Sequence, residues 1–152
     1  MSYIEKVLQP DERVIAFGRK HWIIYLPGIL FIVLGVLIWS FGSMLYPVDY
    51  LWDILGGIIA LFGFLALFRA WFEQWTTEIA VTNRRVVYKA GFISRNTTEM
   101  NMEKIESVAV DQNLWGRIFD YGTVQVRGTG AGIDHLNLIA NPLLLRNAIV
   151  VR

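Results

Sequence analysis

Cysteine is absent from this chain of 152 residues, and histidine occurs only at His21 and His135. The absence of cysteine excludes disulfides, thiol nucleophiles and cysteine-ligated zinc. Two isolated histidines form no metal-ligand cluster, so we expect no metal ion and no other cofactor. Asp134 precedes His135, but neighbouring strand residues point to opposite faces and no motif marks a nucleophile. We therefore expect no catalytic residues and a protein that is not an enzyme.

Charge is also scarce: charged residues make up 18% of the chain, whereas hydrophobic residues make up 55%. Soluble domains carry about 25% charged and about 45–50% apolar residues. This composition excludes a disordered chain and argues against an ordinary water-soluble domain. The formal net charge of +1 gives no support for a nucleic-acid partner, and we expect none.

The apolar residues are concentrated in residues 22–68, where the only charged residues are two aspartates. A short polar break divides this run into segments 22–46 and 50–68. As helices these segments would be roughly 37 Å and 28 Å long, which matches a ~30 Å hydrocarbon core. Trp and Tyr cluster at the segment ends, as they do at membrane interfaces. We therefore predict a transmembrane helical hairpin over residues 22–72.

The distribution of basic residues predicts the orientation of this hairpin. Arg19 and Lys20 precede the first segment and Arg69 follows the second, whereas the connector has no Lys or Arg. The positive-inside rule then places both termini in the cytoplasm, in a two-pass protein of the cell inner membrane. Acidic residues precede the first segment, which is also too long for a signal peptide, so we expect it not to be cleaved.

Small residues recur at regular spacing in both segments, and such stripes let helix backbones approach closely. The stripe residues are Gly28, Gly35 and Gly42 in the first segment and Gly56, Ala60 and Gly63 in the second. They are expected to pack the two helices on each other, to pack neighbouring protomers, or to do both. Pro27 is expected at a kink or in the first turn of its helix.

Asp53 lies near the outer end of the second segment. An acid inside a membrane is a functional candidate, but at this depth its side chain could reach the headgroups or cap the helix. We favour the interfacial role, although the sequence does not decide between the two. No other acid, lysine or histidine within the two segments could complete a proton relay with Asp53, which makes a transporter or channel the weaker alternative.

After Trp75 the pattern changes to the alternation of half-buried β-strands. Strands are expected at residues 76–82, 84–89, 96–102, 105–110, 123–127 and 133–139. Asn141 is expected to cap a C-terminal helix that begins at Pro142. Residues 13–19 also alternate, which predicts a further strand ahead of the first apolar segment.

These patterns predict an α+β membrane protein with three segments. Residues 1–21 would form an N-terminal segment and the first strand of a cytoplasmic module. Residues 22–72 would form the hairpin, and residues 73–152 the rest of the module. The frequent turns favour a sandwich or barrel over a parallel sheet.

Two motifs frame the apolar segments, Leu8-x-x-Asp11-Glu12-Arg13-Val14-Ile15 before them and Val81-Thr82-Asn83-Arg84-Arg85-Val86 after them. With the later stretches 91–95, 102–108, 120–124 and 139–142, they resemble the bacterial PH-like membrane proteins (the bPH2, or YdbS-like, family). The resemblance covers nearly the whole chain and implies a strongly bent antiparallel sheet or barrel closed by a C-terminal helix. It implies little about activity, because fold alone does not give function. The loop at Asn83 is too short for the phosphoinositide site of eukaryotic PH domains.

Four basic residues lie close in sequence around one predicted hairpin, and they are candidate contacts for anionic lipid headgroups or for a partner. They are Arg84, Arg85, Lys89 and Arg95. The alternative is an ordinary solvated face in which Glu78 and Glu99 pair with these cations. Strand alternation also directs Arg84 and Arg85 to opposite faces, so a regular strand cannot present both to lipid.

Two further stretches allow more than one interpretation. Residues 113–122 hold three aromatic side chains among turn-forming residues. We expect them to pack beneath the sheet, and the alternative is a loop that touches the membrane or a partner. The glycine-rich residues 128–132 lack the lysine of a phosphate-binding loop, so we expect a hairpin turn there.

Together these observations predict a non-enzymatic, PH-like inner-membrane module that acts as a homo-oligomeric platform for protein or lipid at the cytoplasmic leaflet. PH-like modules in bacteria are known to form rings, so the resemblance is compatible with self-association. The expected partners are membrane lipid, further copies of this chain and an unidentified membrane protein. The alternatives are a subunit of a channel- or transporter-like assembly and a sensor of anionic lipid headgroups.

Overall fold

The computed structural model of this chain describes residues 7–46, 50–91, 96–130 and 133–150. The chain forms two compact units. One is the hairpin, Trp22–Phe72, and the other is the module, which combines Met1–His21 with Glu73–Arg152. The module is therefore assembled from segments on both sides of the hairpin.

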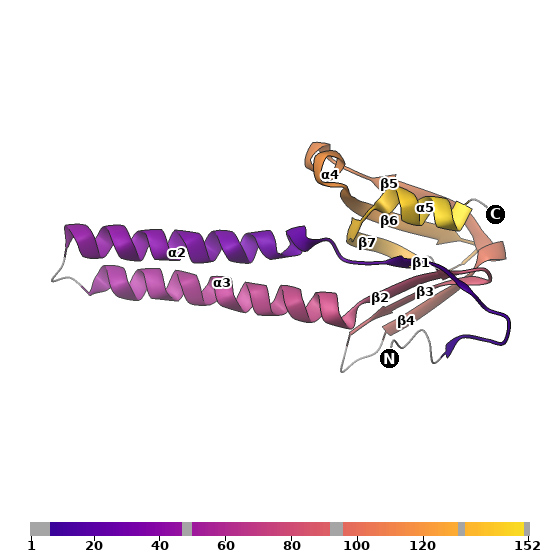
Figure 1. Ribbon diagram of the computed structural model, residues 1–152, viewed down its shortest axis with the longest axis horizontal. Coiled ribbons are helices and arrows are strands. Elements are labelled where there is room, and N and C mark those ends of the chain that lie inside the picture. Colours follow the sequence, from indigo (N-terminus) through magenta and orange to yellow (C-terminus); the bar gives the residue numbers. More distant parts are fainter. Residues whose placement is uncertain (1–6, 47–49, 92–95, 131–132, 151–152) are drawn as a thin grey trace. The chain divides into compact units, whose positions relative to one another are not determined.

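The hairpin consists of a 3₁₀ turn, η1 (Trp22–Tyr25), and two long helices, α2 (Leu26–Leu45) and α3 (Leu51–Thr76) (Figure 1). Pro27 lies in the first turn of α2, where its missing N–H breaks no intrahelical hydrogen bond. Both helices are long and apolar enough to cross a membrane. Only 11% of each apolar window is buried, so most of the apolar side chains point away from the hairpin.

The small residues of both helices lie where α2 and α3 meet. A Cβ atom added at Gly35 would lie 2.6 Å from the Ala60 nitrogen and 2.7 Å from the Gly56 oxygen. Gly28 and Gly63 face each other in the same way, and Gly42 lies against the Trp52 side chain. The two stripes therefore line the helix contact within a single chain, and Gly28, Gly35 and Gly42 are buried in it.

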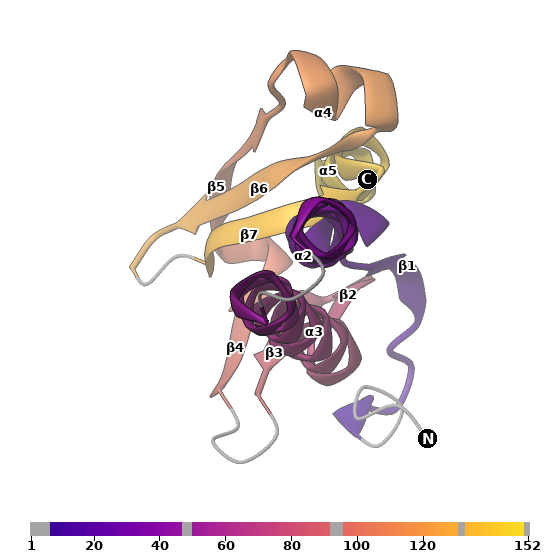
Figure 2. The same cartoon turned by 90° about the vertical axis from the view of Figure 1, so that its left-hand side faces the viewer.

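The module contains two antiparallel sheets and a C-terminal helix. The first sheet has the order β1 (Val14–Gly18), β2 (Glu78–Thr82), β3 (Arg85–Ala90), β4 (Asn96–Asn101). The second has the order β5 (Ile105–Asp111), β6 (Tyr121–Gly128), β7 (Ile133–Ala140), and α5 (Pro142–Val150) follows it. A 3₁₀ turn, η2 (Met102–Lys104), links the sheets, which Figure 2 shows as separate layers. The predicted α+β fold class is confirmed.

Side chains from both sheets and from α5 form one hydrophobic core. Its buried residues are Ile79, Val81, Val86, Met100, Met102, Val124, Val126, Leu136, Ile139, Leu145 and Ile149. The alternation predicted in β6 is confirmed, because Val124 and Val126 are fully buried while Arg127 is exposed.

Strand β7 departs from regular alternation. His135 (φ 52°) and Leu138 (φ 55°) adopt the left-handed conformation, and the pairing of β7 with β6 shifts register on either side of Leu136. As in β-bulges, an extra residue is inserted at each shift. Leu136 and Ile139 are consequently both buried although they are three residues apart. His135 is exposed.

The expectation that residues 113–122 pack beneath the sheet is wrong. Leu114–Phe119 form a short helix, α4, whose large side chains are exposed to solvent. The apolar pattern of this stretch resembles that of a core segment, but the polar residues at its ends fold it into a separate turn of helix. Asn113 supplies the N-cap by accepting a hydrogen bond from the Gly116 N–H.

The module has two distinguishable ends. The chain leaves it after His21 and returns at Glu73, and Lys20 Nζ lies 2.9 Å from Glu73 Oε1. The Lys20 backbone also forms an isolated antiparallel β-bridge with Ile139, near the end of β7. We call this the junction end. Val14 pairs with Thr82 and Gly18 with Ile79, so the β2–β3 turn lies about 13 Å further along β1 at ~3.3 Å per residue. We call that the groove end.

Candidate functional site

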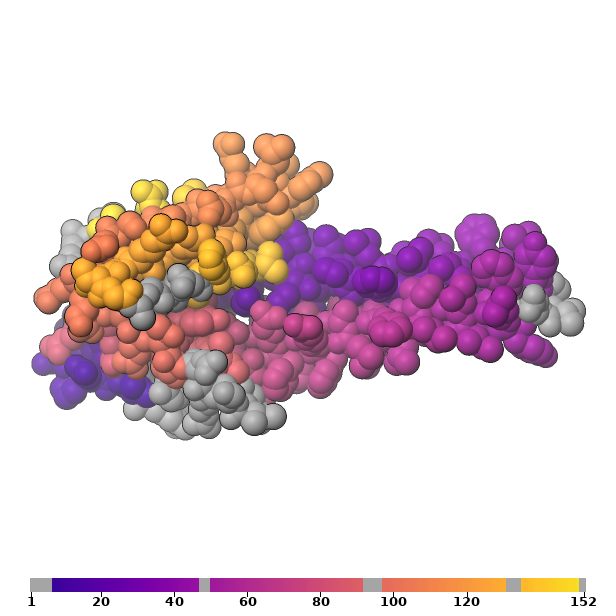
Figure 3. Space-filling model, turned by 180° about the vertical axis from the view of Figure 1, so that it is seen from behind, coloured from indigo at the N-terminus to yellow at the C-terminus, as the bar shows by residue number. Residues whose placement is uncertain are grey.

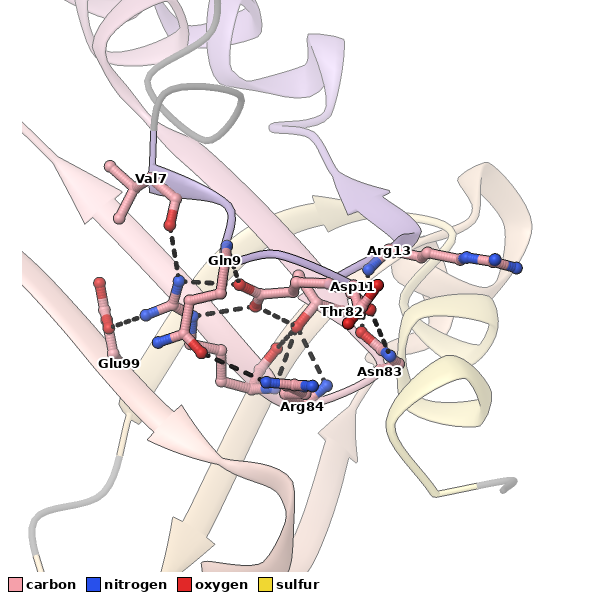
Figure 4. Close-up of polar contacts among 10 residues, drawn as sticks. Val7, Gln9, Asp11, Arg13, Thr82, Asn83, Arg84 and Glu99 are labelled. Carbon is pink, nitrogen blue, oxygen red and sulfur yellow. Dashed lines mark hydrogen bonds and ion pairs between the residues drawn. The ribbon is translucent and has the colours of Figure 1, made fainter.

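The N-terminal segment and the β2–β3 turn are joined by hydrogen bonds at the groove end (Figure 4). The Arg13 N–H donates to Asn83 Oδ1 at 2.9 Å, and the Asn83 N–H donates to the Arg13 carbonyl at 3.1 Å. Asn83 Nδ2 also donates to the Asp11 carbonyl at 3.3 Å. The two motifs that frame the apolar segments in sequence therefore contact each other in space.

A buried ion pair lies beneath this turn. Arg85 donates from Nε to Glu12 Oε1 and from Nη2 to Glu12 Oε2, both at 2.9 Å. Arg85 Nη1 also donates to Glu99 Oε2 at 2.7 Å, and Nη2 to the Val7 carbonyl at 2.8 Å. The Thr82 hydroxyl donates to Glu12 Oε1 at 2.8 Å. The guanidinium thus holds three segments of the chain together.

The surroundings of Glu12 keep it ionised. Burial alone would raise the pKa of this carboxyl group, because Glu12 is only 7% exposed. The hydrogen bonds from Arg85, the Gln9 N–H and Thr82, together with the Arg85 charge, outweigh burial and lower the pKa to about 2. The pKa of Arg85 is raised in turn, chiefly by its hydrogen bonds to Glu12. A carboxylate held in this way has no proton to donate near neutral pH.

A groove of about 680 Å³ opens beside the ion pair. It is lined by Gln9, Ile15, Thr82, Asn83, Arg84, Arg85, Asn101, Met102, Glu103, Ala148 and Ile149. Arg84 is exposed at its rim, and Arg84 Nη1 lies 3.5 Å from Gln9 Oε1. Because it combines an exposed guanidinium with amide groups, the groove can accept an acidic or polar group from a partner.

The predicted basic residues that the structure describes, Arg84, Arg85 and Lys89, differ in their surroundings. Arg84 and Arg85 lie at the groove end, and the Arg85 side chain is only 12% exposed within its ion pairs. Lys89 pairs with Glu78 at 3.5 Å, in line with the alternative that Glu78 and Glu99 neutralise these cations. Arg95 lies outside the described residues. Arg84 is exposed at the groove end, and so is Arg13.

Sequence reasoning missed the role of Glu12. A single acid before a strand carries no signal of burial, and its partner Arg85 lies 73 residues away. The available signal was the joint presence of the Asp-Glu-Arg and Thr-Asn-Arg-Arg motifs, which the structure explains as two halves of one contact.

The described residues show no arrangement suited to catalysis. Among them, no group of three or more His, Asp or Glu residues could hold a metal ion. His135 is exposed, and the His21 ring lies 5.4 Å from the Tyr121 ring in a structural contact.

Two antiparallel sheets closed by a C-terminal helix define a PH-like module. A family model described as bacterial PH domain matches residues 22–144. The chain therefore belongs to the bacterial PH domain family, and the match includes the hairpin helices as well as most of the module. No curated protein and no solved structure matches the chain.

Proposed function

We propose that this chain is a non-catalytic PH-like module anchored in the cell inner membrane by the α2–α3 hairpin. The observation that carries this proposal is the outward exposure of apolar side chains along both helices. Leu30, Phe41, Phe62 and Phe64 are each 59–63% exposed on the chain alone. An exposed apolar surface of this length is unfavourable in water and favourable in hydrocarbon.

The charges beside the helices support one orientation. Arg19, Lys20 and Arg69 lie at the ends that adjoin the module, and the connector between the helices has no basic residue. By the positive-inside rule, the module and both termini lie in the cytoplasm. The chain enters and leaves the hairpin at the junction end of the module, at His21 and Glu73.

The proposed role is that of a homo-oligomeric platform for partner proteins or lipid. In the described residues, β4 and β5 pair with a neighbouring strand on one side only, which leaves an edge for a second copy. The small-residue stripes are occupied by the hairpin itself, so association through them would require the hairpin to open. The groove, with the exposed Arg84 among its lining residues, is the proposed surface for a cytoplasmic partner.

Cysteine labelling tests the orientation with no background, because the natural chain has no cysteine. We expect Glu103→Cys in the module to react with a membrane-impermeant thiol reagent only after cells are opened. Tyr50→Cys, beside the connector, should react in cells whose outer membrane has been permeabilised and whose inner membrane is intact. Labelling of Glu103→Cys in intact cells would overturn the orientation, and a strict monomer in native mass spectrometry of the detergent-extracted chain would overturn the platform.

A further inference from the structure

Helix α4 exposes an unusual amount of apolar surface for so short an element. Its exposed fractions are 76% for Leu114, 62% for Trp115, 69% for Ile118 and 42% for Phe119. The Trp115 and Phe119 rings stack with their centroids 6.1 Å apart, so they form one aromatic face. Figure 3 shows the side chains of α4 standing out from the surface of the module. Soluble surfaces rarely keep large apolar residues together without an occupant.

Hydrogen bonds fix α4 in this exposed position. The Gly116 N–H donates to Asn113 Oδ1 at 2.6 Å, and Gln112 Nε2 donates to the Gly116 and Tyr121 carbonyls at 3.1 Å each. Asp120 ends the helix in the left-handed conformation (φ 57°), and its N–H donates to the Gly116 carbonyl. The exposed side chains are therefore presented by a defined helix with both ends capped.

Helix α4 lies at the junction end of the module. Tyr121, two residues beyond α4, contacts the His21 ring, and His21 is the last residue before the first hairpin element. The Asn141 N–H donates to the Asp120 carbonyl at 3.0 Å, which brings the start of α5 beside α4. Leu143 and Leu144, in the first turn of α5, are 48% and 68% exposed. Two helices thus present apolar side chains at the end from which the chain enters the hairpin.

The charges around these side chains are predominantly basic. Arg117 lies within α4 and Arg146 within α5, both are exposed, and neither helix contains an acid. Asp120 flanks α4 as its C-cap. Aromatic and aliphatic side chains next to arginine suit the interface of a leaflet that carries anionic lipid.

We propose that Leu114, Trp115, Ile118, Phe119, Leu143 and Leu144 form a docking patch that inserts into the interfacial layer of the leaflet adjoining the module. This inference rests on the proposed membrane anchoring and adds a third membrane contact to the two helices. The hairpin alone tethers the module at one end. Insertion of the docking patch fixes the rotation of the module on the membrane and keeps the groove end in the cytoplasm.

The test uses the full chain in vesicles of phosphatidylcholine with phosphatidylglycerol. Single cysteines at Ile118, Leu144, Glu103 and Leu34 carry an environment-sensitive fluorophore, and matched vesicles contain brominated acyl chains that quench by direct contact. Interfacial insertion predicts that fluorescence at positions 118 and 144 falls about twofold in brominated vesicles. Leu34, in the middle of α2, should be quenched at least as strongly, and Glu103 at the groove end should be unaffected.

These positions separate the two hypotheses. If Leu34 is quenched while positions 118 and 144 are not, the hairpin is in lipid and the proposed membrane insertion of the docking patch is wrong. A second copy of the chain or another protein surface would then be its occupant. If Leu34 is not quenched either, the proposed anchoring itself fails.

A charge variant tests the contribution of anionic lipid. The fraction of chains in which the label at position 144 is not quenched measures the undocked state. Replacing Arg117 with Gln should raise this fraction about fivefold in anionic vesicles, because one arginine near such a surface changes the binding equilibrium by about that factor. Arg127→Gln removes the same charge at the groove end of β6 and should change nothing. Equal effects of the two variants would contradict the proposal. Because Arg117 is exposed, we expect the variant to fold normally. An unchanged urea unfolding curve in detergent will check this.

Discussion

The hairpin and the module place their side chains in opposite ways. In the hairpin, the glycines of the α2 stripe lie inside and large apolar residues such as Phe41 and Phe62 lie outside. In the module, Val124, Leu136 and Ile139 are buried and the groove end is rich in charge. Helices in hydrocarbon lack the hydrophobic driving force that water provides, and close backbone approach stabilises their contact. The arrangement of the hairpin side chains is the one expected under the proposed membrane anchoring.

The two units also treat charge differently. The module buries Glu12, and it satisfies this carboxylate with the Arg85 guanidinium and two further hydrogen-bond donors, the Gln9 N–H and the Thr82 hydroxyl. In the hairpin, Asp53 lies in the first turn of α3, and its Oδ1 is buried with no hydrogen-bond partner among the described residues. Charge in the module therefore joins separate segments of the chain, whereas Asp53 and Arg69 of the hairpin lie near opposite ends of α3.

The largest expected effect comes from breaking the ion pair of the module. Arg85→Met keeps the aliphatic stem but leaves the Glu12 carboxylate, 7% exposed, without its guanidinium. Removing one partner of a buried pair costs about 3–5 kcal/mol. Urea unfolding of the detergent-solubilised chain, followed by circular dichroism of the β-sheet, should show this loss.

Arg84→Met is the matched control, because it makes the same change at the neighbouring exposed position. It should shift the free energy of unfolding by less than about 0.5 kcal/mol. Similar losses for the two variants would show that the Glu12–Arg85 pair does not hold the N-terminal segment to the sheet.

A second effect, of about 3 kcal/mol, is expected from pH. The pKa of Glu12 is lowered from 4.5 to about 2 in the folded chain, and each pKa unit corresponds to about 1.4 kcal/mol. A depressed folded pKa stabilises the module above pH 4.5, and this contribution is lost as the pH falls from 4.5 towards 2. Unfolding in urea across this range measures the slope. Glu12→Gln should flatten it, and an unchanged slope would remove Glu12 as its source.

Periodicity predicted most of the module and the whole hairpin, because each element has a local pattern. The strand that contains Val124 and Val126 and the helix that begins at Pro142 could be read directly from the sequence. Strand β7 could not, because two left-handed residues, His135 and Leu138, change which side chains face inward. Such bulges depend on pairing with β6, which no local pattern encodes.

The candidate site was less predictable than the fold. Four basic residues near one turn suggested a common face. Arg85 instead forms an ion pair with Glu12, which precedes the hairpin in the sequence. The exposure of α4 was also missed, since Trp115 and Ile118 have the composition of core residues. Burial depends on how the two sheets assemble. Composition alone therefore does not distinguish an apolar residue in the core from an apolar residue on the surface.

The smallest expected effect, about 1–3 kcal/mol, lies in the hairpin and sharpens the comparison. Gly35→Leu forces a side chain into a contact where even a Cβ would lie 2.6 Å from the Ala60 nitrogen, so the helices must separate. Gly57→Leu adds the same side chain where nothing lies within 4 Å, and it should have no such effect. Distances between spin labels at Leu34 and Leu61, on the exposed sides of the two helices, should lengthen or broaden for Gly35→Leu only. The module should unfold at the same urea concentration in both variants, because its core contains no hairpin residue. Equal label distances in the two variants would show that the stripe does not hold the helices together, and that the hairpin is closed by another part of its surface.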